Sequence, residues 1–129
     1  MNTFSIVLAS ADRTAINDFL ANTNLKDYAV FQATSLAGLV DIINREMVDL
    51  AIIDAGISPD LNKTVIVMLK KINRHLQVIV TARDNSPEFE LKMRESGLAF
   101  YGVHPVDYQA IDGIVEKIRN RKQGHVLSY

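Results

Sequence analysis

Three residues with reactive or hydrogen-bonding side chains each stand where a short apolar run of the chain ends. Asp54 ends the run Leu50–Ile53, Thr81 follows Val78–Val80, and His104 follows Phe100–Val103. Runs of this kind are typical of buried strands, and the carboxyl ends of parallel strands meet at one edge of a sheet, where such folds place their chemistry. A carboxylate, a hydroxyl and an imidazole are therefore predicted to converge on one edge.

The elements that would position these residues are five strands alternating with five helices. The predicted strands are Ser5–Ala9, Tyr28–Ala33, Leu50–Asp54, Gln77–Thr81 and Phe100–Val103. Each is followed by apolar residues spaced by three and four, which indicates an amphipathic helix. The expected helices follow Ser10-Ala11-Asp12 and Ser35, span Asn62–Asn73, and begin again at Ser86 and Asp107. Pro87 directly after Ser86, and Gly97 at the end, are the start and stop residues that helices prefer.

An alternating chain of this kind predicts an α/β fold with a parallel sheet covered on both faces. Parallel neighbours need crossover helices, and those crossovers are right-handed. The run Leu50–Ile53 shows no polar alternation, so we expect it to be the central strand, buried on both sides. This places Asp54 in the crevice at the middle of the carboxyl edge.

Length and composition limit the possible classes of protein. The chain has 129 residues, no cysteine and a net charge of −1. One domain over residues 1–120 is expected, with residues 121–129 as a tail or linker because the apolar periodicity ends near residue 120. The composition predicts a cytoplasmic protein that binds neither membrane nor nucleic acid directly. The basic residues Lys117, Arg119, Arg121 and Lys122 are interpreted as a solvated helix end.

With these residues in place, the sequence resembles the receiver domains of bacterial response regulators over residues 4 to 119. In that family an aspartate at the end of the third strand is phosphorylated by a histidine kinase, and Asp54 matches it. Thr81 matches the hydroxyl residue that senses the phosphoryl group, and Tyr101 matches the aromatic rotamer switch. The resemblance implies a three-layer sandwich with strand order 2-1-3-4-5, the flavodoxin-like or CheY-like fold. It also implies a cis bond between His104 and Pro105.

The sequence departs from the family at the positions that handle charge. The family has an acidic pair that holds Mg²⁺ together with the phosphoacceptor, and the corresponding residues are Ser10 and Ala11. Asp54 would remain only a weak metal ligand, and Asp12, one position further on, is expected to cap a helix instead of reaching a metal. His104 stands where the family has a lysine that pairs with the phosphate.

Two smaller features carry further expectations. Asn62 falls where the family has a turn glycine, and asparagine is the next-best residue for a left-handed conformation. Met47, Met68 and Met93 are expected to fill the core.

Three classes of function remain open. The first is a receiver-like interaction module, with weak or no phosphorylation and no firm cofactor. The second is a functional phosphoacceptor receiver that controls an output domain, for example in transcription regulation. The third, a flavodoxin-like enzyme or nucleotide binder, would need a Gly-rich loop after the first strand, and Ser10-Ala11-Asp12-Arg13-Thr14 has no glycine. The first class is favoured, and no enzyme activity is expected.

Protein partners are expected for both receiver classes. They are a histidine kinase or another signalling partner, an output domain, and a second copy of the chain. The family's usual dimer face is formed by the fourth helix, the fifth strand and the fifth helix. That face is expected to display Glu90, Arg94, Tyr108, Asp112, Glu116 and Arg119. This mixture of both charges suits an isologous, salt-bridged dimer.

Overall fold

The computed structural model describes residues 4–84 and 86–127 and contains five strands and five α-helices in strict alternation. The strands are β1 (Ser5–Ala9), β2 (Ala29–Ala33), β3 (Leu50–Asp54), β4 (Gln77–Ala82) and β5 (Phe100–Val103). The helices are α1 (Arg13–Asn22), α2 (Leu36–Arg45), α3 (Lys63–Ile72), α4 (Pro87–Glu95) and α5 (Tyr108–Leu127). Two short 3-10 turns, η1 (Leu25–Asp27) and η2 (Ala55–Ile57), precede β2 and follow β3.

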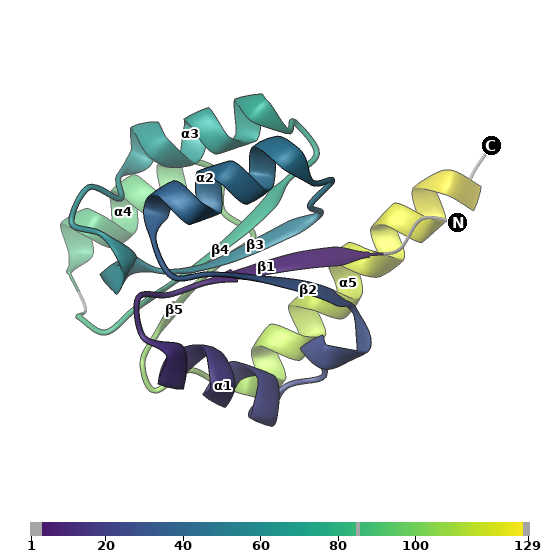
Figure 1. Cartoon of the computed structure of the whole chain (residues 1–129), viewed down its shortest axis with the longest axis horizontal. Coiled ribbons are helices and arrows are strands. Elements are labelled where there is room, and N and C mark those ends of the chain that lie inside the picture. Colours follow the sequence, from purple (N-terminus) through teal and green to yellow (C-terminus); the bar gives the residue numbers. More distant parts are fainter. Residues whose placement is uncertain (1–3, 85, 128–129) are drawn as a thin grey trace.

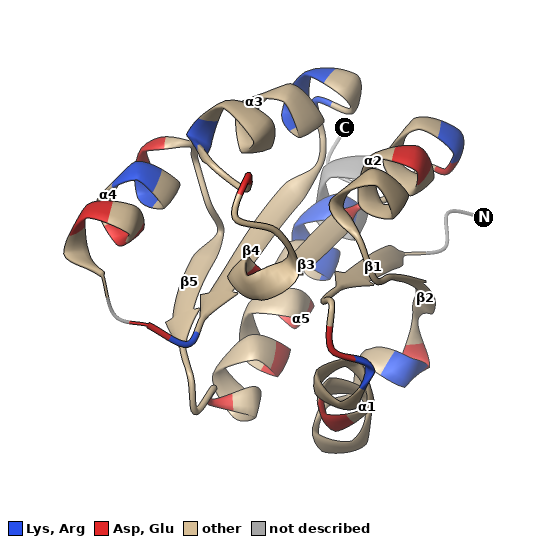
Figure 2. Ribbon diagram, turned by 60° about the vertical axis from the view of Figure 1, so that its left-hand side comes forward, with Lys and Arg blue, Asp and Glu red and all other residues tan. Residues whose placement is uncertain are grey.

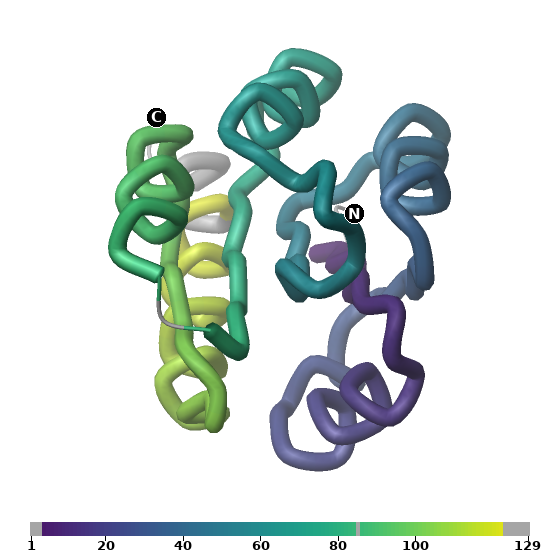
Figure 3. Tube along the Cα trace, turned by 90° about the vertical axis from the view of Figure 1, so that its left-hand side faces the viewer, coloured from purple at the N-terminus to yellow at the C-terminus, as the bar shows by residue number. Residues whose placement is uncertain are grey.

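The strands form one parallel sheet in the order β2-β1-β3-β4-β5, as predicted. Helices α2, α3 and α4 cover one face, and α1 and α5 cover the other, so the molecule has three layers (Figures 1 and 3). β3 is the central strand, and its residues Leu50–Ile53 are all buried. Burying one such large apolar side chain stabilises the fold by roughly 1.5–3 kcal/mol.

Charge is concentrated outside the sheet. Figure 2 shows the charged residues on helices and loops, and within the five described strands Asp54 is the sole charged residue. None of the described helices combines the length and the apolar character that a membrane span requires.

Side-chain caps fix the helix starts where the sequence predicts them. Asp12 accepts a hydrogen bond from the Thr14 amide at 2.9 Å, and Ser86 caps α4 with Pro87 in its first turn. Gly97, just past α4, has a φ of 87°, the left-handed region that glycine occupies most easily.

Two of the smaller expectations are wrong. Asn62 is extended, with a φ of −148°, because its side chain caps α3 by accepting a hydrogen bond from the Val65 amide. Only Met93 is buried, whereas the exposed fractions of Met47 and Met68 are 82% and 41%. The helix α5 also continues to Leu127, past the point where its apolar periodicity ends. The division into a domain of residues 1–120 and a tail or linker of residues 121–129 stays a prediction.

At the edge of the sheet opposite Asp54, Asp49 connects the starts of β1 and β3 with α5. Its carboxylate accepts a hydrogen bond from the Ser5 amide at 2.8 Å and pairs with the Lys122 ammonium at 2.8 Å. Lys122, interpreted from the sequence as part of a solvated helix end, therefore anchors α5 to the starts of β1 and β3.

Candidate functional site

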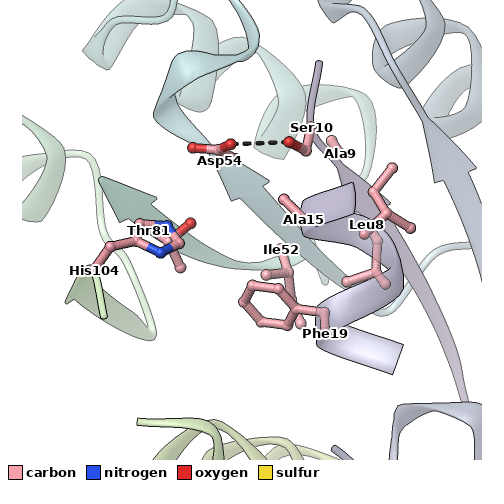
Figure 4. A pocket seen from close by; sticks show the side chains of 10 residues that line it. Leu8, Ala9, Ser10, Ala15, Phe19, Ile52, Asp54, Thr81 and His104 are labelled. Carbon is pink, nitrogen blue, oxygen red and sulfur yellow. Dashed lines mark hydrogen bonds between the residues drawn. The ribbon is translucent and has the colours of Figure 1, made fainter. Parts of the chain in front are cut away.

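The candidate site lies at the carboxyl edge of the sheet, around Asp54 at the end of β3. Asp54 and Thr81 are direct register partners on the neighbouring strands β3 and β4. The Asp54 carboxylate is partly exposed and already has two hydrogen-bond donors. The Ser10 hydroxyl donates to Oδ2 at 2.9 Å (Figure 4). The Gly56 amide donates to Oδ1 at 3.1 Å.

Ser10 connects Asp54 with the loop after β1. It is buried, with 4% of its surface exposed, and its amide donates to the Ala33 carbonyl at 3.0 Å. Its hydroxyl also accepts from the Asp12 amide at 3.1 Å. Ser10 is thus held by its backbone bond to β2 and by its side-chain bond to the cap of α1, and its hydroxyl presents a neutral donor to the carboxylate.

Ala11 and Asp12 complete the loop. Ala11 is exposed and has no side-chain polar group. The Asp12 carboxylate is bonded to the first turn of α1, at the Thr14 amide, as a helix cap. Its predicted capping role is therefore confirmed.

These residues do not make the arrangement that a divalent cation needs. Mg²⁺ prefers carboxylate oxygens in an octahedral set. Within residues 4–84 and 86–127, no three His, Cys, Asp or Glu side chains come together in a group that could hold a metal ion. Because Ser10 and Ala11 supply no carboxylate and Asp12 is bonded to the Thr14 amide, the residues present do not fit the metal that the resemblance implies.

Thr81 and His104 line the same small cavity as Asp54 and Ser10, so the predicted convergence of acid, hydroxyl and imidazole is present. The cavity has a volume of about 20 Å³, and apolar side chains of β1, β3 and α1 form the rest of its wall. Thr81 is 1% exposed. Its Oγ1 and the Nε2 of His104 are buried atoms with no hydrogen-bond partner among the described residues.

The electrostatic surroundings keep His104 neutral. Burial lowers the pKa of its imidazole below the ordinary value of 6.5, and the nearby Arg83 guanidinium lowers that pKa further, while Asp54 raises it. Arg83 is not predicted from the sequence as a site residue, although its place two residues after Thr81 puts it in the loop after β4, close to His104. The bond between His104 and Pro105 is cis, as predicted.

An open groove of about 550 Å³ adjoins the site on the other side of His104. Phe19 and Tyr108 meet edge-on there, with ring centroids 5.2 Å apart. Asp12 and Asp18 of the α1 region and Arg83 of the β4–α4 loop also line this groove. The site is thus flanked by a surface with both aromatic and charged character.

Tyr101 lies on β5 under the helix α4. Its ring is 5% exposed, packs against Phe89 and lies 5.7 Å from the Arg94 guanidinium, which is paired with Glu90 at 2.8 Å. Burial raises the pKa of the Tyr101 hydroxyl, and the Glu90 carboxylate adds to this rise. The structure therefore holds the ring inward.

The composition predicted for the α4–β5–α5 face is partly wrong. Asp112 accepts a hydrogen bond from the Asn24 amide at 2.9 Å, and Tyr108 packs on Phe19 of α1. Both side chains therefore point toward the α1 side of α5. The sequence could not assign them, because the rotation of α5 about its axis depends on how the helix packs against α1.

Comparison with known proteins places the fold. The sequence matches no protein-family model, and the search of curated proteins gives no match. A CheY-like response regulator receiver domain protein from Methanospirillum hungatei superposes with a TM-score of 0.80 and 18% identity, covering 95% of this chain and 98% of that chain. The signal receiver domain of an HD domain-containing protein from Pseudomonas fluorescens gives 0.84 and 14%, covering 95% and 99%.

A receiver domain protein from Clostridium thermocellum gives a TM-score of 0.79 and 20% identity, covering 93% of this chain and 97% of that chain. The chain thus has the fold of CheY-like response regulator receiver domains, with the strand order and the five helices that the sequence predicts.

Proposed function

We propose that this chain is a receiver-like module of two-component signal transduction that works by protein–protein contact, with weak or no phosphorylation. The observation that carries the proposal is the state of the Asp54 carboxylate. It is bonded by the neutral Ser10 hydroxyl and Gly56 amide, at the place where phosphoryl chemistry requires positive charge.

The charges around Asp54 favour the first of the two receiver classes. Phosphoryl transfer depends on positioning and on neutralising charge at the phosphoryl oxygens, and a metal ion normally supplies much of both. Ser10 and Ala11 bring no charge to the loop after β1. The lowered pKa of His104 leaves its imidazole neutral at pH 7, so this residue adds no cation either. Both losses weaken catalysis of phosphorylation at Asp54.

The retained scaffold supports a role in binding. In this proposal the domain presents one standing conformation, with Tyr101 held inward by Arg94, and no catalysis by the chain is required. The surface around α4 and β5 offers Glu90 and Arg94 to a partner. The partners proposed are a second copy of the chain, a histidine kinase or another signalling protein, and an output domain.

The test compares the wild-type chain with the Asp54→Asn variant. Both are incubated with Mg²⁺ and acetyl phosphate, then examined by intact mass spectrometry and sedimentation velocity. We expect no phosphoryl adduct on either protein and the same self-association for both. An adduct on the wild type alone, accompanied by a change in oligomeric state, would overturn the proposal.

That contrary result would favour the second candidate, a functional phosphoacceptor receiver. One observation supports this alternative. Asp54 is partly exposed at the carboxyl edge, directly beside Thr81 in register, as phosphorylation and sensing would require. Under this alternative, a histidine kinase phosphorylates Asp54 and the domain controls an output domain.

A further inference from the structure

Two buried polar atoms beside Asp54 lack partners and face the same cavity. Oγ1 of Thr81 and Nε2 of His104 are both shielded from solvent, and both residues line the 20 Å³ cavity. Figure 4 shows the His104 ring directed toward Thr81 on one side of this pocket, with Asp54 above it. His104 also borders the open groove, but its Nε2 is buried and so does not face that groove.

It is energetically unfavourable to leave two buried polar atoms without hydrogen-bond partners at one place. A buried donor or acceptor left unsatisfied costs about 1–3 kcal/mol. A water needs a cavity of at least about 10–15 Å³ and between about two and four polar partners. The cavity of about 20 Å³ meets the first condition, and Thr81, His104 and Asp54 meet the second.

We propose that this cavity is a binding site for one structural water that bridges Thr81 and His104 beside Asp54. The water accepts a hydrogen bond from the Thr81 hydroxyl and donates one to Nε2 of His104. Its second proton points to the Asp54 carboxylate, whose two described donors leave further lone pairs free. This assignment requires the neutral His104 tautomer that carries its proton on Nδ1.

The bridge would couple the end of β4 to the β5–α5 loop without any phosphoryl group. The bridge engages the hydroxyl and the imidazole that otherwise face Asp54. It therefore adds a stabilising contact to the standing conformation proposed for this site. The proposal nevertheless rests on cavity size and unpaired atoms alone. Its failure would therefore leave the phosphorylation test of the proposed function untouched.

The first test is a crystal structure of the full chain at a resolution that orders buried waters. We expect a peak within hydrogen-bond distance of both Thr81 Oγ1 and His104 Nε2. The nitrogen-15 shifts of the His104 ring should show an unprotonated Nε2. An empty cavity, a direct bond between Thr81 and His104, or a proton on Nε2 would overturn the proposal.

The second test measures the change in the free energy of unfolding on Thr81→Val. The sign of this change distinguishes a Thr81 hydroxyl that is bonded to a water from one that has no partner. With a bridging water, Thr81→Val removes a real hydrogen bond, and the equilibrium constant for unfolding should rise about fivefold. Thr81→Ser keeps the hydroxyl, so the bridging water should persist in its crystal structure, although the loss of a buried methyl group also destabilises this variant. Thr23→Val is the matched control, because the buried Thr23 hydroxyl donates directly to the Phe19 carbonyl. A Thr81→Val variant as stable as the wild type, or more stable, would show that the hydroxyl has no partner.

Discussion

The Ser10 hydroxyl donates a 2.9 Å hydrogen bond to Oδ2 of Asp54 and thereby ties the end of β1 to the end of β3. The two residues are 44 positions apart in the chain, and both lie at the carboxyl edge of the sheet. A neutral hydroxyl in this position satisfies the carboxylate without a cation. Much of the behaviour expected of this site follows from that pairing.

Removing the Ser10 hydroxyl should destabilise the domain. Because the bond goes to a carboxylate but is only partly buried, Ser10→Ala should lower the free energy of unfolding by about 1 kcal/mol. Urea denaturation of Ser10→Ala, Asp54→Ala and the double variant would measure the pairwise term. If the two single effects simply add, the bond contributes nothing to stability.

Restoring the acids should restore metal binding. The wild type is expected to show little change in the amide shifts of residues 10 and 54 on titration with Mg²⁺. The double substitution Ser10→Asp with Ala11→Asp places two carboxylates next to Asp54, the donor type that Mg²⁺ prefers. We expect saturable shifts in this variant, measured by NMR. Saturable binding by the wild type would mean that another carboxylate supplies the site.

Lowering the pH should weaken the fold through His104. Burial lowers the pKa of His104 in the folded protein below the ordinary value of 6.5, so below pH 6.5 the unfolded state binds more protons. This contribution to stability is complete above pH 6.5 and is lost as the pH falls through the folded pKa. The charged groups that shift the pKa of His104 are Arg83 and Asp54, and Asp12 and Asp18 line the groove that His104 borders.

Thermal denaturation between pH 7.5 and pH 5, about one unit above and about one and a half units below the ordinary histidine pKa, would measure this effect. His104→Gln should flatten the pH dependence, whereas the same substitution at the exposed His75 should leave it unchanged. Equal slopes for the wild type and His104→Gln would contradict the assignment.

The sequence predicts the architecture well because local signals and long-range packing agree. The unbroken apolar run Leu50–Ile53 can be buried on both faces only in the middle of a parallel sheet, and the structure places it there. Caps such as Asp12 and Ser86 are local hydrogen bonds, so residue type and position suffice to predict them.

The features that the sequence predicts wrongly or does not predict have physical reasons. Asparagine favours both the left-handed region and the helix cap, and at Asn62 the bond to the Val65 amide favours the cap. The Ser10–Asp54 bond and the Asp49–Lys122 pair join residues 44 and 73 positions apart. Contacts of this kind depend on strand order and helix rotation, which residue spacing alone does not determine.

The anchor of α5 should contribute more to stability than an ordinary surface ion pair. Lys122 and Asp49 are 32% and 20% exposed at their side chains, whereas Arg45 and Asp41 are 60% and 59% exposed. Lys122→Met keeps the aliphatic stem and should lower the free energy of unfolding by about 1 kcal/mol. Arg45→Met, the matched control, should change it by less than about 0.5 kcal/mol. Chemical denaturation compares the two variants, and equal effects would show that the anchor is no stronger than a surface pair.

The proposed interaction role predicts that the α4 surface carries self-association. Arg94 is exposed on α4 and pairs with Glu90, so Arg94→Glu would place two acids side by side on the proposed face. We expect the dissociation constant of the dimer to rise at least about tenfold, equivalent to about 1.4 kcal/mol, in sedimentation equilibrium. Asp112→Asn is the control, because Asp112 contacts Asn24 on the α1 side. Circular dichroism would verify that both variants fold. Self-association that weakens equally in both variants, or only in Asp112→Asn, would move the interface from α4 to the α1 side of α5.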